Sequence, residues 1–162
     1  MLRKDVAFAK RAQLTIDAAA LFAFLSTPHN HLGLQPLVSQ VSNLQEFAAA
    51  NGATGYRYTF VERLPIAGPL AWYQPSQAQM IPQPDTYQIE FVIRSFPGLR
   101  MHCLYRLTPL LQGTEITETV NISVYSFLAP YVLKMAEQAH EAMFRRLQER
   151  FNRQPFVDST IR

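Results

Sequence analysis

The stretch APYVLKMAEQAHEAMFRRLQERF, residues Ala129–Phe151, decides the fold of this chain. Its apolar residues recur at helical spacing and form one stripe: Val132, Ala136, Ala139, Met143, Leu147 and Phe151. The charged residues fall mainly on the opposite side, and Pro130 suits the first turn of a helix. A helix of this length with an apolar stripe needs a broad surface to lie on, and the rest of the sequence offers only a sheet.

The stretch before this helix, GTEITETVNISVY (Gly113–Tyr125), has the alternation of a half-buried strand. Four apolar residues point to one side: Ile116, Val120, Ile122 and Val124. Glu118 points to the same side. Three explanations are open: Glu118 has a role in a site, a bulge shifts the register, or Glu118 pairs with an inward Lys10, Arg or Tyr hydroxyl.

The rest of the chain predicts an antiparallel meander. Extended segments occupy residues 56–66, 70–81, 86–96 and 99–110, and short turn-like breaks (AGP, PQPD and PG) separate them. A first strand is predicted over residues 6–16, followed by a short helix, Ala18–Leu25, with Asp17 as its N-cap. Residues 29–36 form a loop or a short helical turn. The predicted assembly is α+β, with the last helix across the concave face of the sheet.

Composition narrows the class of protein. The 162 residues predict a single domain, with a core of about residues 4–152 and a C-terminal tail at 153–162. The single cysteine, Cys103, excludes an intramolecular disulfide and a multi-cysteine zinc site. The net charge of +3 is small, and we find no nucleic-acid-binding motif, signal-peptide core or membrane span. We expect a cytoplasmic protein with no nucleic-acid partner and no stable membrane insertion; homo-oligomerisation stays open.

Two stretches carry a resemblance to a known family: LTIDAAALFAFLSTPHNHLGLQPLVSQV (residues 14–41) and VERLPIAGPLAWY (residues 61–73). With the order of elements, they make the chain similar to the START-like, or SRPBCC, superfamily, which includes polyketide cyclase/dehydrase-like proteins and lipid-transport domains. The resemblance implies a helix-grip fold: a curved, antiparallel seven-stranded sheet, two short helices and a long C-terminal helix over an internal cavity. The family's usual proline after the strand-ending acid is absent, since Ala18 follows Asp17.

If the family's cavity is present, alternation predicts which side chains surround a ligand. The candidate ligand-binding residues are Tyr56, Tyr58, Phe60, Tyr87, Ile89, Phe91, Met101, Cys103, Tyr105, Val120, Ala136 and Met143. Trp72 and Tyr73 either rim the entrance or are ordinary surface aromatics. An apolar pocket and a filled apolar core share this pattern, so the sequence alone leaves both open.

Two titratable residues are candidates for catalysis. Glu118 could act as general acid or base, and His140, within the helix stripe, could bind a ligand or move a proton near neutral pH. Each could equally be a satisfied core residue. Glu62 shares the inward register of its strand, but its place near a strand end favours solvent exposure. His29 and His31 lie where the family places a portal, and they make a weak metal signal.

Familiar catalytic motifs are missing: a Gly-rich phosphate loop, HExxH, GxSxG and CxxC. Cys103 shows no neighbouring base in the sequence and is best described as a small buried hydrophobe. We therefore predict binding or carriage of a hydrophobic or aromatic small molecule, lipid or polyketide-like, without cofactor or metal. The alternatives are a cofactor-free cyclase/dehydratase-like enzyme that uses Glu118 or His140 as acid or base, and an interaction module with a vestigial cavity.

Overall fold

The computed structural model describes residues 2–152, so the predicted tail at 153–162 lies outside the described residues. The elements follow one another in this order: β1 (Arg3–Leu14), α1 (Ala18–Leu25), the short 3-10 helix η1 (Pro28–His31), β2 (Val38–Ala48), β3 (Thr54–Ala67), β4 (Leu70–Gln83), β5 (Gln88–Ser95), β6 (Leu99–Leu110), β7 (Gly113–Tyr125) and α2 (Ala129–Phe151). In the described part of the chain, no helix is both long enough and apolar enough to span a bilayer.

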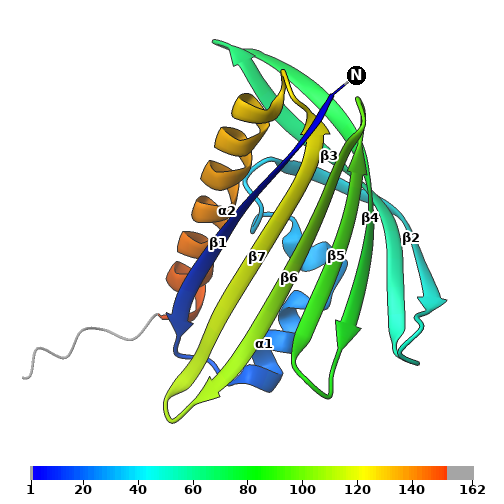
Figure 1. The fold of residues 1–162 in the computed structure, drawn as a ribbon. Helices are drawn as coiled ribbons and strands as arrows, with labels where there is room; N and C mark the ends of the chain where they lie inside the picture. Colours follow the sequence, from blue (N-terminus) through cyan, green and yellow to red (C-terminus); the bar gives the residue numbers. More distant parts are fainter. Residues whose placement is uncertain (1, 153–162) are drawn as a thin grey trace, which may run out of the picture.

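The strands form one antiparallel sheet of seven strands within residues 2–152, in the order β1-β7-β6-β5-β4-β3-β2. Strands β2 to β7 are neighbours in sequence order, which confirms the meander, and β1 closes the series beside β7. Figure 1 shows the curved sheet with α2 running along it, and α1 at the end where β6 turns into β7. The predicted α+β helix-grip architecture is confirmed.

Several strand boundaries differ from the predicted ones, and two of the differences have a visible cause. β1 ends at Leu14 instead of residue 16, because the next backbone groups bond elsewhere: Thr15 N donates to Asn152 Oδ1 (3.0 Å), and Ile16 O accepts from Thr114 Oγ1 (2.7 Å). β5 begins at Gln88 instead of residue 86, because Tyr87 has a φ of 49° in the left-handed region. The alternation read through Tyr87 is therefore broken.

α2 covers the residues that its apolar stripe predicts, but its two halves have different surroundings. In the C-terminal half, Met143, Phe144 and Leu147 are buried. In the N-terminal half, Val132 and Ala139 of the same stripe are only half-buried. The helix packs against β1 and β7, so it leaves open the space above the middle of the sheet.

α1 closes one end of this space. Its N-cap is the predicted one, since the Asp17 side chain accepts a hydrogen bond from Ala20 N (2.8 Å). Leu21 and Leu25 of α1 are fully buried in the same apolar core as Leu147 of α2. The core is therefore closed at the α1 end, and the free volume lies toward the beginning of α2.

Candidate ligand cavity and its buried dyad

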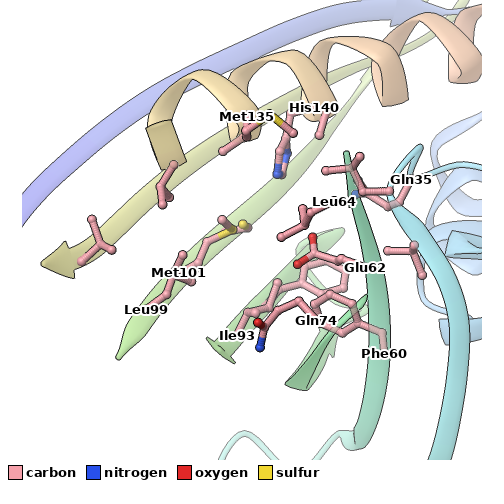
Figure 2. Close-up of a pocket in the computed structure, with 18 of the residues that line it drawn as sticks. Gln35, Phe60, Glu62, Leu64, Gln74, Ile93, Leu99, Met101, Met135 and His140 are labelled. Carbon is pink, nitrogen blue, oxygen red and sulfur yellow. The ribbon is translucent and has the colours of Figure 1, made fainter. Parts of the chain in front are cut away.

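A cavity of about 260 Å³ lies between the first part of α2 and the sheet. Side chains from β2 to β7 and from α2 line it, and most of them are apolar. Figure 2 shows His140 pointing into it from α2, with Glu62 and Gln74 on the other side and Met101 and Leu99 along the wall. The free volume distinguishes this molecule from one with an ordinary filled core.

Eight of the predicted site residues line the cavity: Tyr58, Phe60, Phe91, Met101, Cys103, Tyr105, Ala136 and His140. The other predicted site residues lie outside the lining: Tyr56, Tyr87, Ile89, Glu118, Val120 and Met143. Ile89, Val120 and Met143 have no exposed surface and belong to the filled apolar core. Tyr87 turns away and packs against Phe22 of α1, with ring centroids 5.7 Å apart.

Glu118 points inward, as the alternation of its strand predicts. β7 pairs in unbroken register with both neighbours, where Glu118 stands opposite Lys10 of β1 and Tyr105 of β6, so no bulge turns its side chain around. The side chain has no exposed surface. Its partner is His140: Nδ1 lies 2.7 Å from Glu118 Oε1. Neither Lys10 nor an arginine forms an ion pair with Glu118 in the described residues.

The Glu118–His140 dyad connects the buried carboxylate to the cavity. Glu118 Oε2 has no hydrogen-bond partner in the described residues, so the carboxylate depends on His140. The ring of Phe8 packs edge-on against His140, at 5.4 Å between ring centroids, and fixes the imidazole from the side. With Glu118 ionised, Nδ1–H donates to Oε1, and the Nε2 lone pair is left free to accept a proton or a hydrogen bond. Such a carboxylate sets the tautomer and orientation of the imidazole.

Cys103 and Tyr105 border the dyad. Burial raises the pKa of the Cys103 thiol well above its usual value, and the charge of Glu118 raises it further. Burial also raises the pKa of Tyr105, again with the charge of Glu118 as the second cause. Both groups therefore stay protonated and neutral. The Tyr105 hydroxyl lies 3.3 Å from Met143 Sδ.

No base stands near Cys103 in the sequence, whereas the fold brings one close to it. One ligand-type atom each from Cys103, Glu118 and His140 lies within 4.8 Å of the others, although the three residues come from β6, β7 and α2. These donor types can bind zinc. However, two atoms that share one ion at about 2.0–2.2 Å lie roughly 3.3 Å apart, and the 2.7 Å contact of His140 with Glu118 is shorter. The present geometry fits a shared proton better than a shared ion.

Glu62 lies on the wall that faces the dyad. The prediction of solvent exposure is corrected, because Glu62 is flanked by Val38 of β2 and Gln74 of β4 and keeps the inward register of its strand. The side chain is half-buried and lines the cavity. Burial raises the pKa of Glu62, and the opposing charge of His140 is the smaller, lowering cause. The Glu62 carboxylate is therefore poorly solvated, because the cavity wall around it is mostly apolar.

Two further polar side chains of the cavity lining, His31 and Gln74, are engaged in hydrogen bonds. His31 is buried, and its Nε2–H donates to Leu25 O (2.9 Å), so it anchors η1 to α1 instead of forming an open portal; burial lowers its pKa. His29 is exposed. Gln74 accepts from Trp72 Nε1 (3.0 Å) and donates to Pro75 O (3.0 Å). Trp72 and Tyr73 are exposed and do not line the cavity.

Known proteins resemble this chain in structure only. No protein-family model and no curated protein matches its sequence. A START superfamily protein from Mycobacterium smegmatis is 13% identical, with a TM-score of 0.68, over 90% of this chain and 97% of that chain. An aromatase/cyclase from Streptomyces sp. R1128 is 12% identical, with a TM-score of 0.63, over 92% of this chain and 96% of that chain.

A third similar structure is norcoclaurine synthase from Thalictrum flavum, in complex with dopamine and hydroxybenzaldehyde. It is 13% identical, with a TM-score of 0.57, over 91% of this chain and 86% of that chain. At these identities the likeness concerns the course of the backbone and no particular residue. With the observed sheet order and the long final helix, it shows that the chain has the helix-grip fold of START superfamily proteins.

Proposed function

We propose that this protein binds or carries a small hydrophobic or aromatic molecule in the cavity beneath α2. The observation that carries the proposal is the free volume of about 260 Å³ with a mostly apolar lining. An apolar cavity of about 150 Å³ is enough to bind benzene, so this one suits a compound of one or two rings or a short acyl chain. The free volume favours carriage over an interaction module with a vestigial cavity.

Two considerations support an aromatic ligand. The wall offers aromatic faces at Tyr58, Phe60 and Phe91, against which a flat ring can stack. Norcoclaurine synthase, which shares the fold, is described in complex with two single-ring aromatic compounds. The binding free energy would come chiefly from burial, at about 25 cal/mol per Å² of apolar area before the costs of association and ordering.

Native mass spectrometry of protein purified from its own host tests carriage directly. We expect the native spectrum to show an added mass of a few hundred daltons or less, released under denaturing conditions. A matched variant is Ala139→Phe, which places a ring in the cavity. We expect it to weaken binding of the fluorescent probe N-phenyl-1-naphthylamine at least about tenfold, since the ring and the probe compete for one volume. Absence of a bound compound, together with equal probe affinity in both proteins, would contradict the proposal.

A second candidate function is catalytic, and the Glu118–His140 dyad favours it. His140 Nε2 would remove a proton from a carbon next to a ligand carbonyl, and the ionised Glu118 would stabilise the imidazolium that forms. The electron pair of the broken C–H bond passes to the carbonyl as an enolate, and the neutral Tyr105 hydroxyl on the cavity lining is a candidate donor to stabilise it. Cyclisation and dehydration of polyketide-like compounds both begin with such a step and need no cofactor.

Hydrogen–deuterium exchange at the α-carbon of 2-tetralone in D₂O, followed by NMR, tests this step. In Glu118→Gln the negative charge that stabilises the imidazolium is lost, and where the amide N–H donates to Nδ1 the proton is held on Nε2, so His140 becomes a weaker base. We expect exchange to slow by about 10²–10⁴-fold relative to the wild type. Glu46→Gln, which removes an exposed carboxylate on β2, is the control and should exchange at the wild-type rate. Equal rates in all three proteins would exclude the dyad as a base.

A further inference from the structure

Glu62 is the one carboxylate on the cavity lining, as far as residues 2–152 show. In the sheet it stands between Val38 of β2 and Gln74 of β4, neither of which carries a charge. The side chains that follow and precede it on the same face of β3 are Leu64 and Phe60, both apolar. No cation on these three strands therefore faces the carboxylate.

Nothing within the described residues satisfies this carboxylate by a hydrogen bond or an ion pair. Gln74 is its closest polar neighbour in the register, but both ends of the Gln74 amide are engaged by Trp72 and Pro75. Across the cavity stands His140, with its Nδ1 committed to Glu118. Figure 2 shows that Glu62 and His140 point toward the same space, Glu62 from β3 and His140 from α2. A ligand in this space lies between the Glu62 carboxylate and the His140 imidazole, and in the described part of the chain neither has a hydrogen-bond partner on the side that faces the cavity.

We propose that Glu62 is a second polar anchor of the cavity, and that the cavity selects a small aromatic molecule with a hydrogen-bond-donating head, an amine or a hydroxyl, directed to Glu62. This inference rests on the proposed binding function. An ionised carboxylate only accepts hydrogen bonds, so it pairs with N–H or O–H groups and leaves a ligand carboxylate unpaired and repelled. The buried charge of Glu118 behind His140 adds to this repulsion. Fatty acids and aromatic acids should therefore bind more weakly than amines and alcohols, although they suit the apolar wall.

Four probes with one shared ring system test the selection: naphthalene, 2-naphthol, 1-naphthylmethylamine and 2-naphthoate. Their dissociation constants are measured by calorimetry at pH 7.5. For the wild type we expect the naphthylmethylamine and the naphthol to bind about tenfold or more tightly than naphthalene, because a desolvated charge-assisted hydrogen bond contributes at least that much. We expect naphthoate to bind most weakly. The ranking of amine against hydroxyl identifies which of the two heads the site prefers.

Glu62→Gln is the decisive variant and Glu46→Gln its exposed control. Glu62→Gln should leave naphthalene affinity within about twofold, remove at least about nine-tenths of the preference for the amine, and improve naphthoate binding. The control should match the wild type. Equal affinities for the four probes would overturn the role of Glu62 while leaving the binding function intact. A preference for the amine that survives Glu62→Gln would do the same. Failure of all four probes, naphthalene included, would overturn both.

Discussion

Glu62 and Glu118 are two carboxylates at or near the same cavity, and they differ in burial and in hydrogen-bond partners. Glu118 has no exposed surface and one close partner, His140. Glu62 is half-buried and has no partner in the described residues. Replacing the first by Gln removes the carboxylate charge beside a buried histidine, whereas replacing the second by Gln relieves a poorly solvated charge. The two substitutions to Gln should therefore affect stability in different ways.

The pH dependence of stability tests the surroundings of Glu62. Because burial raises its pKa in the folded protein above the ordinary value near 4.5, the folded state holds this proton more tightly than the unfolded state. The contribution of Glu62 to stability is therefore present below about pH 4.5 and is lost as the pH rises through the folded-state pKa. Relative to Glu62→Gln, the wild type should lose free energy of unfolding on going from pH 4 to pH 8. Urea unfolding of both proteins over this range gives the difference.

Two results would decide this prediction. Glu46→Gln, which removes an exposed carboxylate, should follow the wild type at every pH. A difference between wild type and Glu62→Gln that stays constant from pH 4 to pH 8 would show that the Glu62 carboxylate is as well solvated in the folded protein as in the unfolded chain.

At the scale of residues, the sequence predicted the direction in which a side chain points better than the residue that it contacts. The alternation in β7 placed Glu118 on the inner face, because side chains on a strand point to opposite sides with period two. The contact with His140 was not predictable, since it depends on the rotation of α2 above the sheet. Tyr87 was misplaced because its φ of 49° interrupts the alternation, and no residue pattern in TYQIEF signals that turn. Glu62 was misjudged because its burial depends on the strands beside it and on the cavity wall, which the sequence of its own strand does not show.

At the scale of elements, α2 combines a structural half and a half that faces the cavity. Leu147 has no exposed surface and packs in the closed core, whereas Val132 is half-buried on the cavity wall. Leu147→Ala should lower the free energy of unfolding by about 2–5 kcal/mol, because it leaves a void in a filled region. Val132→Ala should cost less than about 1.5 kcal/mol, since its side chain already borders free volume. Guanidinium unfolding of the two variants measures both values.

The affinity for a probe should change more in Val132→Ala than in Leu147→Ala, which reverses the order expected for stability. Val132→Ala changes the cavity wall and should alter the affinity for naphthalene, whereas Leu147→Ala, in the closed core, should leave it nearly unchanged. Equal losses of stability in the two variants would mean that the N-terminal half of α2 is as tightly packed as the C-terminal half. The bounds of α2 themselves were predictable, because one uninterrupted apolar stripe with Pro130 in the first turn marks the helix.

At the scale of the whole molecule, the cavity follows from unequal coverage of one sheet. α2 packs on β1 and β7 and α1 reaches β5 and β6, so the inner face of the sheet near the start of α2 stays uncovered. Near this open end, Phe96 and Tyr131 line the cavity and are also exposed, at 78% and 51%. The sequence predicted the sheet, the helix and their apolar inner faces. It did not distinguish a filled core from a hollow one, because that depends on the distance between the layers.

The division of α2 into two halves also bears on how such a chain can change over generations. Residues that hold the fold together and residues that line the cavity occupy different turns of the same helix. Substitutions in the early turns can alter which compound fits while the late turns keep the chain above its folding threshold. New ligand preferences are then reached through viable intermediates, and one backbone can serve unrelated small molecules in proteins that share little sequence.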